Sequence, residues 1–316
     1  MKFLIFTILF FLSFSCAKRQ QYTRQQLNNA INSKPNNLKQ KIFVRIGDLG
    51  GEMMEFQKKN NFFDIKFMDE NQSIDRAKNI LDEDKFQKYL IALYPKIDDK
   101  GICYIDFESP YFDDLLFEQK GSQKFNESMR IYVHAYQLGK KLRPNVQFGF
   151  YNFPSSNSTF GNYWQANEKF DELFRNSDIF FPSLYLSGGY KDNSFEKNFE
   201  YVKSNIELAL SYGKKYNKPV YPFIMHRNYA EDKKVMFSNI TFKEWKEYIQ
   251  MLTTTSYQGK YIDGVVWWGA DDFYYDREEG KNILKGRSFT SKEEFIECND
   301  KELMKYSKIL LNTIEK

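Results

Sequence analysis

The stretch Gly101-Ile102-Cys103-Tyr104-Ile105-Asp106-Phe107-Glu108 predicts a buried strand that ends in two carboxylic acids. Side chains alternate along a strand, so Asp106 and Glu108 point to one side and Phe107 to the other. Two neighbouring carboxyl groups at the end of an apolar strand resist ionising together, so we expect one of them to keep its proton near neutral pH. A general acid needs this property. The alternative is a strand that ends in a solvated turn with two ordinary surface acids.

Strand-like and helix-like segments alternate on both sides of this stretch. The predicted strands are residues 42–46, 62–67, 101–108, 146–153, 178–185, 219–225 and 262–268, and the predicted helices are residues 73–94, 127–142, 195–210, 241–252 and 301–314. About seven strand–helix units without a dinucleotide glycine fingerprint favour a closed barrel over a doubly wound sheet. We therefore predict an α/β fold, a single (β/α) barrel of about seven to eight strands that resembles a TIM barrel and occupies residues 41–316.

Composition limits the classes of function. The net charge is +4, from 46 basic and 42 acidic residues, and the two signs are interspersed, so neither nucleic acid nor a membrane surface is a predicted partner. The two histidines, His134 and His226, form no metal-ligand pattern, and a structural role is favoured for both. We predict no metal and no cofactor.

The N-terminal residues have the pattern of a secretory signal peptide. Met1-Lys2 precedes an apolar run over residues 3–14, and Ser15-Cys16-Ala17 follows it. We expect residues 1–17 to be a signal peptide, with a bacterial lipoprotein site at Cys16 as a minor alternative. Residues 18–40 are polar and aperiodic, which is typical of a mobile leader. The mature protein is expected to be secreted, or to lie in the lumen of the secretory or lysosomal route, without membrane anchorage.

Four Asn-x-Ser/Thr sequons are acceptors for glycosylation if the source is eukaryotic. They lie at Asn71, Asn126, Asn157 and Asn239. The cysteines that remain after removal of residues 1–17 are Cys103 and Cys298, and an oxidising compartment allows them to pair.

Polar and aromatic side chains recur where the predicted strands end. They are Asp106, Glu108, Tyr151, Tyr185, Trp268 and Asp271. In a β/α barrel the carboxyl ends of the strands meet at one mouth, and the chemistry lies there. This convergence favours an active site over surface acids.

Four motifs add a resemblance. They are Ile105-Asp106-Phe107-Glu108, then Leu142-Arg143-Pro144 with Phe148-Gly149-Phe150-Tyr151-Asn152-Phe153-Pro154, then Pro182-Ser183-Leu184-Tyr185-Leu186, and finally Gly264-Val265-Val266-Trp267-Trp268-Gly269. In these motifs, their order and their spacing, the chain from about residue 40 onward resembles the hyaluronidase family of glycoside hydrolases (family 56), which is found in venoms and animal tissues.

The resemblance implies a distorted β/α barrel that cleaves β-1,4 bonds after N-acetylhexosamine in hyaluronan or chondroitin-like glycosaminoglycans. It implies that Glu108 protonates the leaving oxygen and that Asp106 holds the 2-acetamido group, whose carbonyl oxygen attacks the anomeric carbon. Tyr151 and Tyr185 would position this group, Trp268 would form the wall under the sugar, and Trp267 would pack outward. Two acids on one face of one strand cannot flank a sugar ring, which agrees with substrate-assisted, retaining hydrolysis.

The chain also departs from the family pattern. Ser109-Pro110-Tyr111 stands where the family has a Trp-Arg-Pro element, so a basic residue beside the cleft is missing. Arg227, just past the sixth predicted strand, is our candidate for a replacement that binds a uronate. Cys298 matches the C-terminal half-cystine of the family, and Cys103 is its candidate partner.

Two other functions stay open. A glycan-binding barrel without catalysis is one, and Glu108 argues against it because such barrels arise when the acid is lost. A chitinase-type hydrolase of neutral N-acetylhexosamine polymers is the other, and the Phe-Tyr-x-Phe-Pro and Trp-Gly motifs argue against it.

Overall fold

The computed structural model describes residues 27, 29, 39–155, 167–186, 195–229, 235–271, 275 and 288–315. The predicted signal peptide, most of the predicted leader and the sequon at Asn157 lie outside these residues. No helix in the described ranges is both long enough and apolar enough to cross a membrane.

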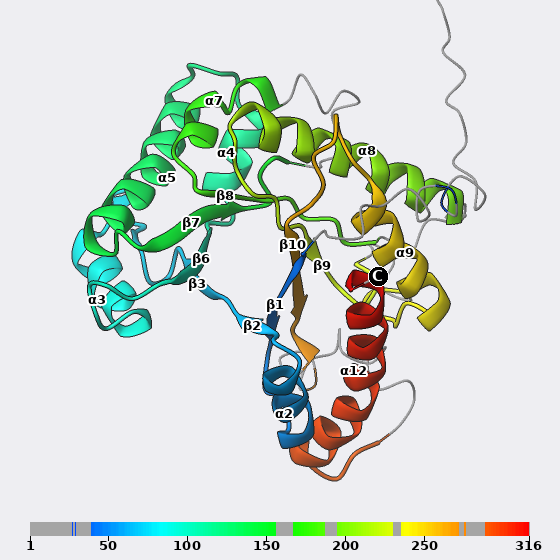
Figure 1. Ribbon diagram of the computed structural model, residues 1–316. Coiled ribbons are helices and arrows are strands. Elements are labelled where there is room, and N and C mark those ends of the chain that lie inside the picture. The colour runs from blue at the N-terminus through cyan, green and yellow to red at the C-terminus, as the bar shows by residue number, and fades with distance from the viewer. Residues whose placement is uncertain are drawn as a thin grey trace, which may run out of the picture.

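Parallel strands take seven positions around a ring. Figure 1 shows these strands with helices around them. In chain order the strands are β1 (Lys41–Ile46), β2 (Phe63–Asp64) followed directly by β3 (Lys66–Asp69), β6 (Gly101–Asp106), β7 (Val146–Tyr151), β8 (Ile179–Phe181), β9 (Phe223–Ile224) and β10 (Gly264–Gly269). They pair in two groups, β2-β1-β10-β9 and β3-β6-β7-β8.

The two groups close into one barrel at two places. Residues 63–69 run from one group to the other, because β2 pairs with β1 through Phe43 and Phe63 while β3 pairs with β6 through Asp69 and Asp106. On the other side, parallel bridges link residues 180 and 183 to residues 220 and 223, with hydrogen bonds that include Phe223 N–H to Pro182 O at 2.8 Å. The predicted barrel is therefore confirmed.

Helices lie outside the ring (Figure 1). They are α2 (Gly51–Lys59), α3 (Glu83–Leu93), α4 (Tyr111–Phe117), α5 (Gln123–Leu142), α7 (Asp171–Arg175), α8 (Phe195–Lys215), α9 (Phe242–Thr254) and α12 (Lys292–Ile314). The helix α12 packs against α9 and α2, so the C-terminal end of the chain covers the side of the barrel near β1. The predicted capping box of α9 is present, with Thr241 and Glu244 each bonded to the other's backbone N–H.

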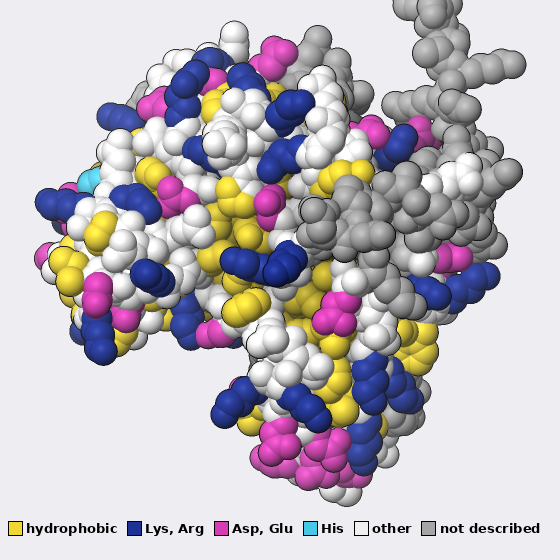
Figure 2. All heavy atoms as spheres, viewed as in Figure 1, with side chains coloured by type: hydrophobic (Ala, Val, Ile, Leu, Met, Phe, Trp, Pro, Cys, Tyr) yellow, Lys and Arg dark blue, Asp and Glu magenta, His cyan; other side chains and the backbone are white. Residues whose placement is uncertain are grey.

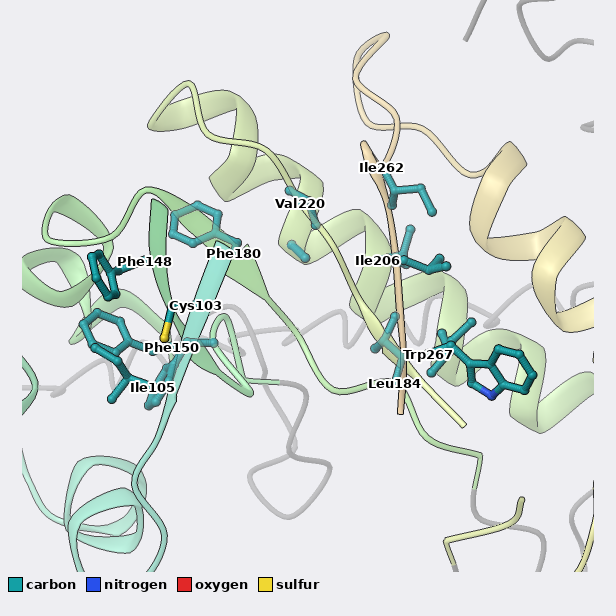
Figure 3. Close-up of a cluster of buried hydrophobic side chains, with 14 of the residues drawn as sticks. Cys103, Ile105, Phe148, Phe150, Phe180, Leu184, Ile206, Val220, Ile262 and Trp267 are labelled. Carbon is teal, nitrogen blue, oxygen red and sulfur yellow. The ribbon is translucent and has the colours of Figure 1, made fainter. Parts of the chain in front are cut away.

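Strand alternation separates two apolar layers. The layer between strands and helices includes Cys103, Ile105, Phe148, Phe150, Phe180 and Trp267, which Figure 3 shows together with Ile206 of α8. The layer inside the ring consists of Phe43, Ile65, Ile102, Tyr104, Ile179, Phe181, Tyr221, Phe223 and Val266. The inside is therefore filled by side chains, and a ligand can only bind at its mouth.

Two predicted helices differ clearly in extent from the observed ones. The helix predicted for residues 73–94 is shorter, because residues 74–81 form the antiparallel hairpin of β4 (Ile74–Asp75) and β5 (Ile80–Leu81), and α3 begins at Glu83 behind the cap residue Asp82. The last helix begins at Lys292 rather than at residue 301, with Ser291 as its N-cap.

The candidate disulfide is absent from the described residues. Cys103 is buried in β6 and Cys298 lies on α12, and the structure forms no disulfide between them. Cys103 faces the helix layer, where burial raises the pKa of its thiol.

Candidate active site

The acid pair lies at the carboxyl end of β6. Asp106 is the last residue of the strand and is half-buried, whereas Glu108, two residues further, is exposed. Phe107 between them is buried on the opposite side, against the rings of Tyr111 and Tyr132. The Tyr132 hydroxyl of α5 donates to the Phe107 carbonyl at 2.6 Å. This anchor on the helix side holds the backbone that carries both acids.

Both acids bind protons more tightly than an isolated carboxyl group does. Burial, reinforced by the negative charges of Glu108, Glu70 and Asp69, raises the pKa of Asp106 to about 8. Burial and the charges of Glu70 and Asp69 also raise the pKa of Glu108. One acid of the pair thus keeps its proton at neutral pH, as predicted, and the larger rise falls on Asp106.

Two further acids, which sequence reasoning missed, come from the end of the neighbouring strand. Asp69 is the register partner of Asp106. Glu70 is buried, with Oε1 3.0 Å from Arg76 Nη2, and its Oε2 accepts the Glu108 backbone N–H at 3.4 Å. The predicted strand stopped at residue 67, so the Asp-Glu pair at 69 and 70 was not recognised as a second strand end with two acids.

Aromatic side chains surround the mouth beside the acids. Tyr151, Tyr185 and Trp268 are half-buried and pack on the layer inside the ring. The Tyr151 hydroxyl donates to Ser183 Oγ at 3.2 Å. The rings of Tyr185 and Trp268 lie 5.8 Å apart between centroids.

The phenols of Tyr151 and Tyr185 interact electrostatically with Asp106. Burial raises the pKa of Tyr151, and the charge of Asp106 raises it further. Burial also raises the pKa of Tyr185, with contributions from Tyr151 and, more weakly, Asp106. Both phenols are therefore neutral hydrogen-bond donors near Asp106 at any pH at which the protein functions.

Hydrophobic side chains gather in the middle of the face shown in Figure 2, in the region of β8 and β10, with charged side chains of both signs around them. Five of the predicted site residues lie at the ends of β6, β7 and β10 and in the segment after β8. They are Asp106, Glu108, Tyr151, Tyr185 and Trp268.

The other two predicted site residues are corrected by the structure. Arg227 is buried and pairs with Asp271 through Nε–Oδ1 at 2.6 Å and Nη2–Oδ2 at 3.0 Å. Its remaining donors bind the Phe237 carbonyl, Asn239 Oδ1 and Asn299 Oδ1. All five N–H groups of the guanidinium are used, so Arg227 cannot take a sugar carboxylate without breaking this network.

His226 and Trp267 extend the same network on the helix side of β9 and β10. The Trp267 indole N–H donates to His226 Nδ1 at 3.2 Å, and His226 Nε2 lies 3.3 Å from Asp271 Oδ2. An indole N–H only donates, so Nδ1 is the acceptor and the neutral ring carries its proton on Nε2. Burial lowers the pKa of His226, in keeping with a neutral ring. The predicted outward packing of Trp267 and structural role of His226 are confirmed.

The second histidine and one of the predicted glycosylation acceptors lie away from the mouth. His134 pairs with Glu83 at 3.1 Å on the surface. The Asn239 amide, part of a sequon, donates to Glu302. Among the residues that the structure describes, no three His, Cys, Asp or Glu side chains form a cluster able to hold a metal ion.

Comparison with known proteins gives one consistent family. The family model described as hyaluronidase matches residues 98–287, which is more than half of the chain. Inactive hyaluronidase B of Vespula vulgaris is 23% identical over 298 residues, covering 82% of this chain and 83% of that protein. Hyaluronidase Tab y 2.0101 of Tabanus yao is 24% identical over 188 residues, covering 55% of this chain and 50% of that protein.

Solved structures agree on the fold. Bee venom hyaluronidase in a monoclinic crystal superimposes with a TM-score of 0.60 at 15% identity, covering 88% of this chain and 100% of that one. Bee venom hyaluronidase in complex with a hyaluronic acid tetramer gives a TM-score of 0.58 at 16% identity, covering 79% of this chain and 95% of that one. The architecture is thus a distorted (β/α) barrel of the type that these enzymes have.

Proposed function

The chain belongs to the hyaluronidase family, and from this membership we propose that it is a secreted, endo-acting glycoside hydrolase that cleaves β-1,4 bonds after N-acetylhexosamine in hyaluronan or chondroitin-like glycosaminoglycans. Relatives named as hyaluronidases and one named as a chondroitin hydrolase of Caenorhabditis elegans support this substrate class. Secretion is proposed from the signal-like pattern of residues 1–17, which precede a leader at 18–40 and the catalytic domain at 41–316.

The observation that carries the proposal is that both acids of the pair have raised pKa values. Both carboxyl groups stand on one side of one strand end, the pKa of Asp106 is raised to about 8, and the pKa of Glu108, the proposed proton donor, is raised as well. Two acids on the same side cannot supply a nucleophile and an acid from opposite faces of a sugar. They can supply an acid for the leaving oxygen and a partner for the 2-acetamido group of the same sugar.

The proposed reaction has two steps. Glu108 gives its proton to the glycosidic oxygen while the carbonyl oxygen of the acetamido group attacks the anomeric carbon, so the C–O bond to the leaving sugar breaks as the new C–O bond forms. The Glu108 carboxylate then takes a proton from water, which opens the cyclic intermediate and restores the acid. Two inversions leave the product with the configuration of the substrate.

The neighbouring groups have the following roles in the proposed reaction. Asp106 binds the acetamido N–H side and orients the carbonyl oxygen for attack. The neutral phenols of Tyr151 and Tyr185 donate hydrogen bonds toward the acetamido oxygen as charge develops there. Trp268 offers an indole face to the apolar C–H face of the pyranose.

A reducing-end release assay tests this function. We expect the secreted mature protein to release reducing ends from hyaluronan or chondroitin, and less from chondroitin sulfate or chitin oligomers. Glu108→Gln, which removes only the transferable proton, should abolish release and leave the melting temperature unchanged. The proposal would be refuted if none of the four polymers were cleaved at any pH between acid and neutral.

A second candidate is a glycan-binding barrel without catalysis. It is favoured by one observation, that a relative matched along 83% of its length is named an inactive hyaluronidase. Two measurements separate these functions. A binding protein without catalysis releases no reducing ends in the assay above, but it still binds the polymer when affinity is measured by calorimetry.

A further inference from the structure

A cation lies in the barrel mouth and has no acidic partner among the residues that the structure describes. Arg45 lies on β1 and is the register partner of Trp268 on β10. Residues paired in a parallel sheet point to the same side, so Arg45 faces the mouth as Trp268 does. It is half-buried, and its guanidinium lies over the Phe67 ring at 4.8 Å from the centroid.

The contact of Arg45 with the Phe67 ring is a cation–π contact, which does not use up the N–H groups of the guanidinium. Phe67 in turn stacks on Tyr104 of the inner layer, with centroids 5.6 Å apart and planes at 20°. A stacked guanidinium presents its N–H groups sideways, in the fork that matches a carboxylate. Within the described part of the chain, Arg45 makes no ion pair or hydrogen bond through these N–H groups.

Among the described residues, the nearby acids form no ion pair with Arg45. The charges that shift the pKa of Asp106 are all negative and come from Glu108, Glu70 and Asp69. Arg45 acts instead on the phenol of Tyr104, whose pKa it lowers against the stronger effect of burial. In the part of the chain that the structure describes, Arg45 thus forms no ion pair with Asp106 or Glu108.

We propose that Arg45 binds the carboxylate of a uronic acid sugar that neighbours the sugar seated against Trp268. Adjacent strands lie about 4.8 Å apart, so the register partners Arg45 and Trp268 can contact successive sugars of one chain. The family element that would place a basic residue after the acids is replaced here by Ser109-Pro110-Tyr111, and Arg227 has no donor to spare. This inference rests on the proposed function and assigns its substrate specificity to one residue.

The test crosses two variants with two forms of one polymer. Kinetics are measured on hyaluronan and on hyaluronan whose carboxyl groups have been reduced to alcohols. Arg45→Met keeps the apolar stem over Phe67 and removes the charge. Lys66→Met is the matched control, because Lys66 precedes Phe67, pairs with Asp64 and lies in register with the outward-facing Cys103.

We expect Arg45→Met to lower kcat/KM for native hyaluronan about 10-fold to 100-fold, mainly through KM, as loss of a charge-assisted hydrogen bond does. The variant should process the reduced polymer as the parent protein does, and Lys66→Met should match the parent on both polymers. Equal effects of Arg45→Met on both polymers, or no effect on either, would overturn the inference.

A binding measurement tests the role of Arg45 separately from catalysis. In a Glu108→Gln background, calorimetry with a hyaluronan oligosaccharide should show the same loss of affinity when Arg45 is replaced. A parent protein that cleaves neither polymer would refute the proposed function, whereas undiminished binding by the double variant would refute the role of Arg45 alone.

Discussion

Asp106 and Glu108 are two residues apart in the sequence but lie in different environments. Asp106 sits in the mouth beside Tyr151, and Glu108 is exposed beyond the strand end. The sequence predicted that one acid would keep its proton but could not tell which one. That depends on how deep each carboxyl group lies and on the charges of Asp69 and Glu70, which belong to another strand.

Glu70 provides a prediction at this scale. Its negative charge raises the pKa of Glu108 and of Asp106, and its Oε2 accepts the Glu108 N–H. A general acid works only while protonated, so a raised pKa extends activity toward higher pH. Glu70→Gln removes the charge, lowers the pKa of both acids, and should move the alkaline limb of the pH–rate profile down by roughly 1 pH unit.

The control for this experiment is Asp64→Asn. Asp64 is another carboxylate of the same chain segment, but it is exposed and paired with Lys66. We expect its pH–rate profile to match that of the parent. An unchanged profile for Glu70→Gln, or a limb displaced to higher pH, would show that Glu70 does not influence the acid.

Arg45 and Glu70 show why single residues of a site escape sequence analysis. Arg45 lies within a correctly predicted strand, yet its position in the mouth depends on the pairing of β1 with β10, more than 200 residues away. Glu70 lies beside the acids only because β3 and β6 are neighbours in the ring. Alternation predicts which side a residue faces, but not which strands are adjacent.

At the scale of elements, local periodicity gave a wrong prediction for the segment before α3. Apolar residues at spacings that suit a helix made residues 74–81 look helical, but they form a hairpin. The Asp75 carboxylate accepts the backbone N–H groups of Ala77 and Lys78, and Asn79 takes a φ of 54°. Such side-chain bonds to the backbone compete with a helix and stabilise a turn.

The link between β9, β10 and α12 gives a second prediction. Arg227 and Asp271 are buried together, with Asn299 of α12 bonded to both. Although burial raises it, the charge of Arg227 holds the pKa of Asp271 well below its usual range. Arg227→Met leaves this carboxylate buried without its partner, which should cost about 3–5 kcal/mol of unfolding free energy in a urea titration.

Arg175→Met is the matched control, because Arg175 also pairs with an aspartate, Asp171, but on the surface. Its loss should cost under about 1 kcal/mol. The folded fraction of Arg227→Met should keep the KM of the parent for uronate polymers. A large rise in KM without loss of stability would return Arg227 to the substrate site.

At the scale of the whole molecule, the order of strands and helices was enough to predict a closed barrel. Seven predicted strands match seven positions of the ring, and parallel pairing joins them throughout. The short helices α2, α4 and α7 were not predicted, and neither was the division of residues 63–69 between two neighbours, because each depends on contacts across the barrel rather than on local pattern.

The central claim is that this barrel cleaves a glycosaminoglycan through the acid pair and the acetamido group of the substrate. Proton NMR of the first-formed product from a hyaluronan oligosaccharide tests it most directly, because the anomer at the new reducing end records the path of the reaction. We predict that the parent protein releases the β-anomer first and that Glu108→Gln releases no product. Initial formation of the α-anomer, or unchanged turnover by Glu108→Gln, would contradict the account.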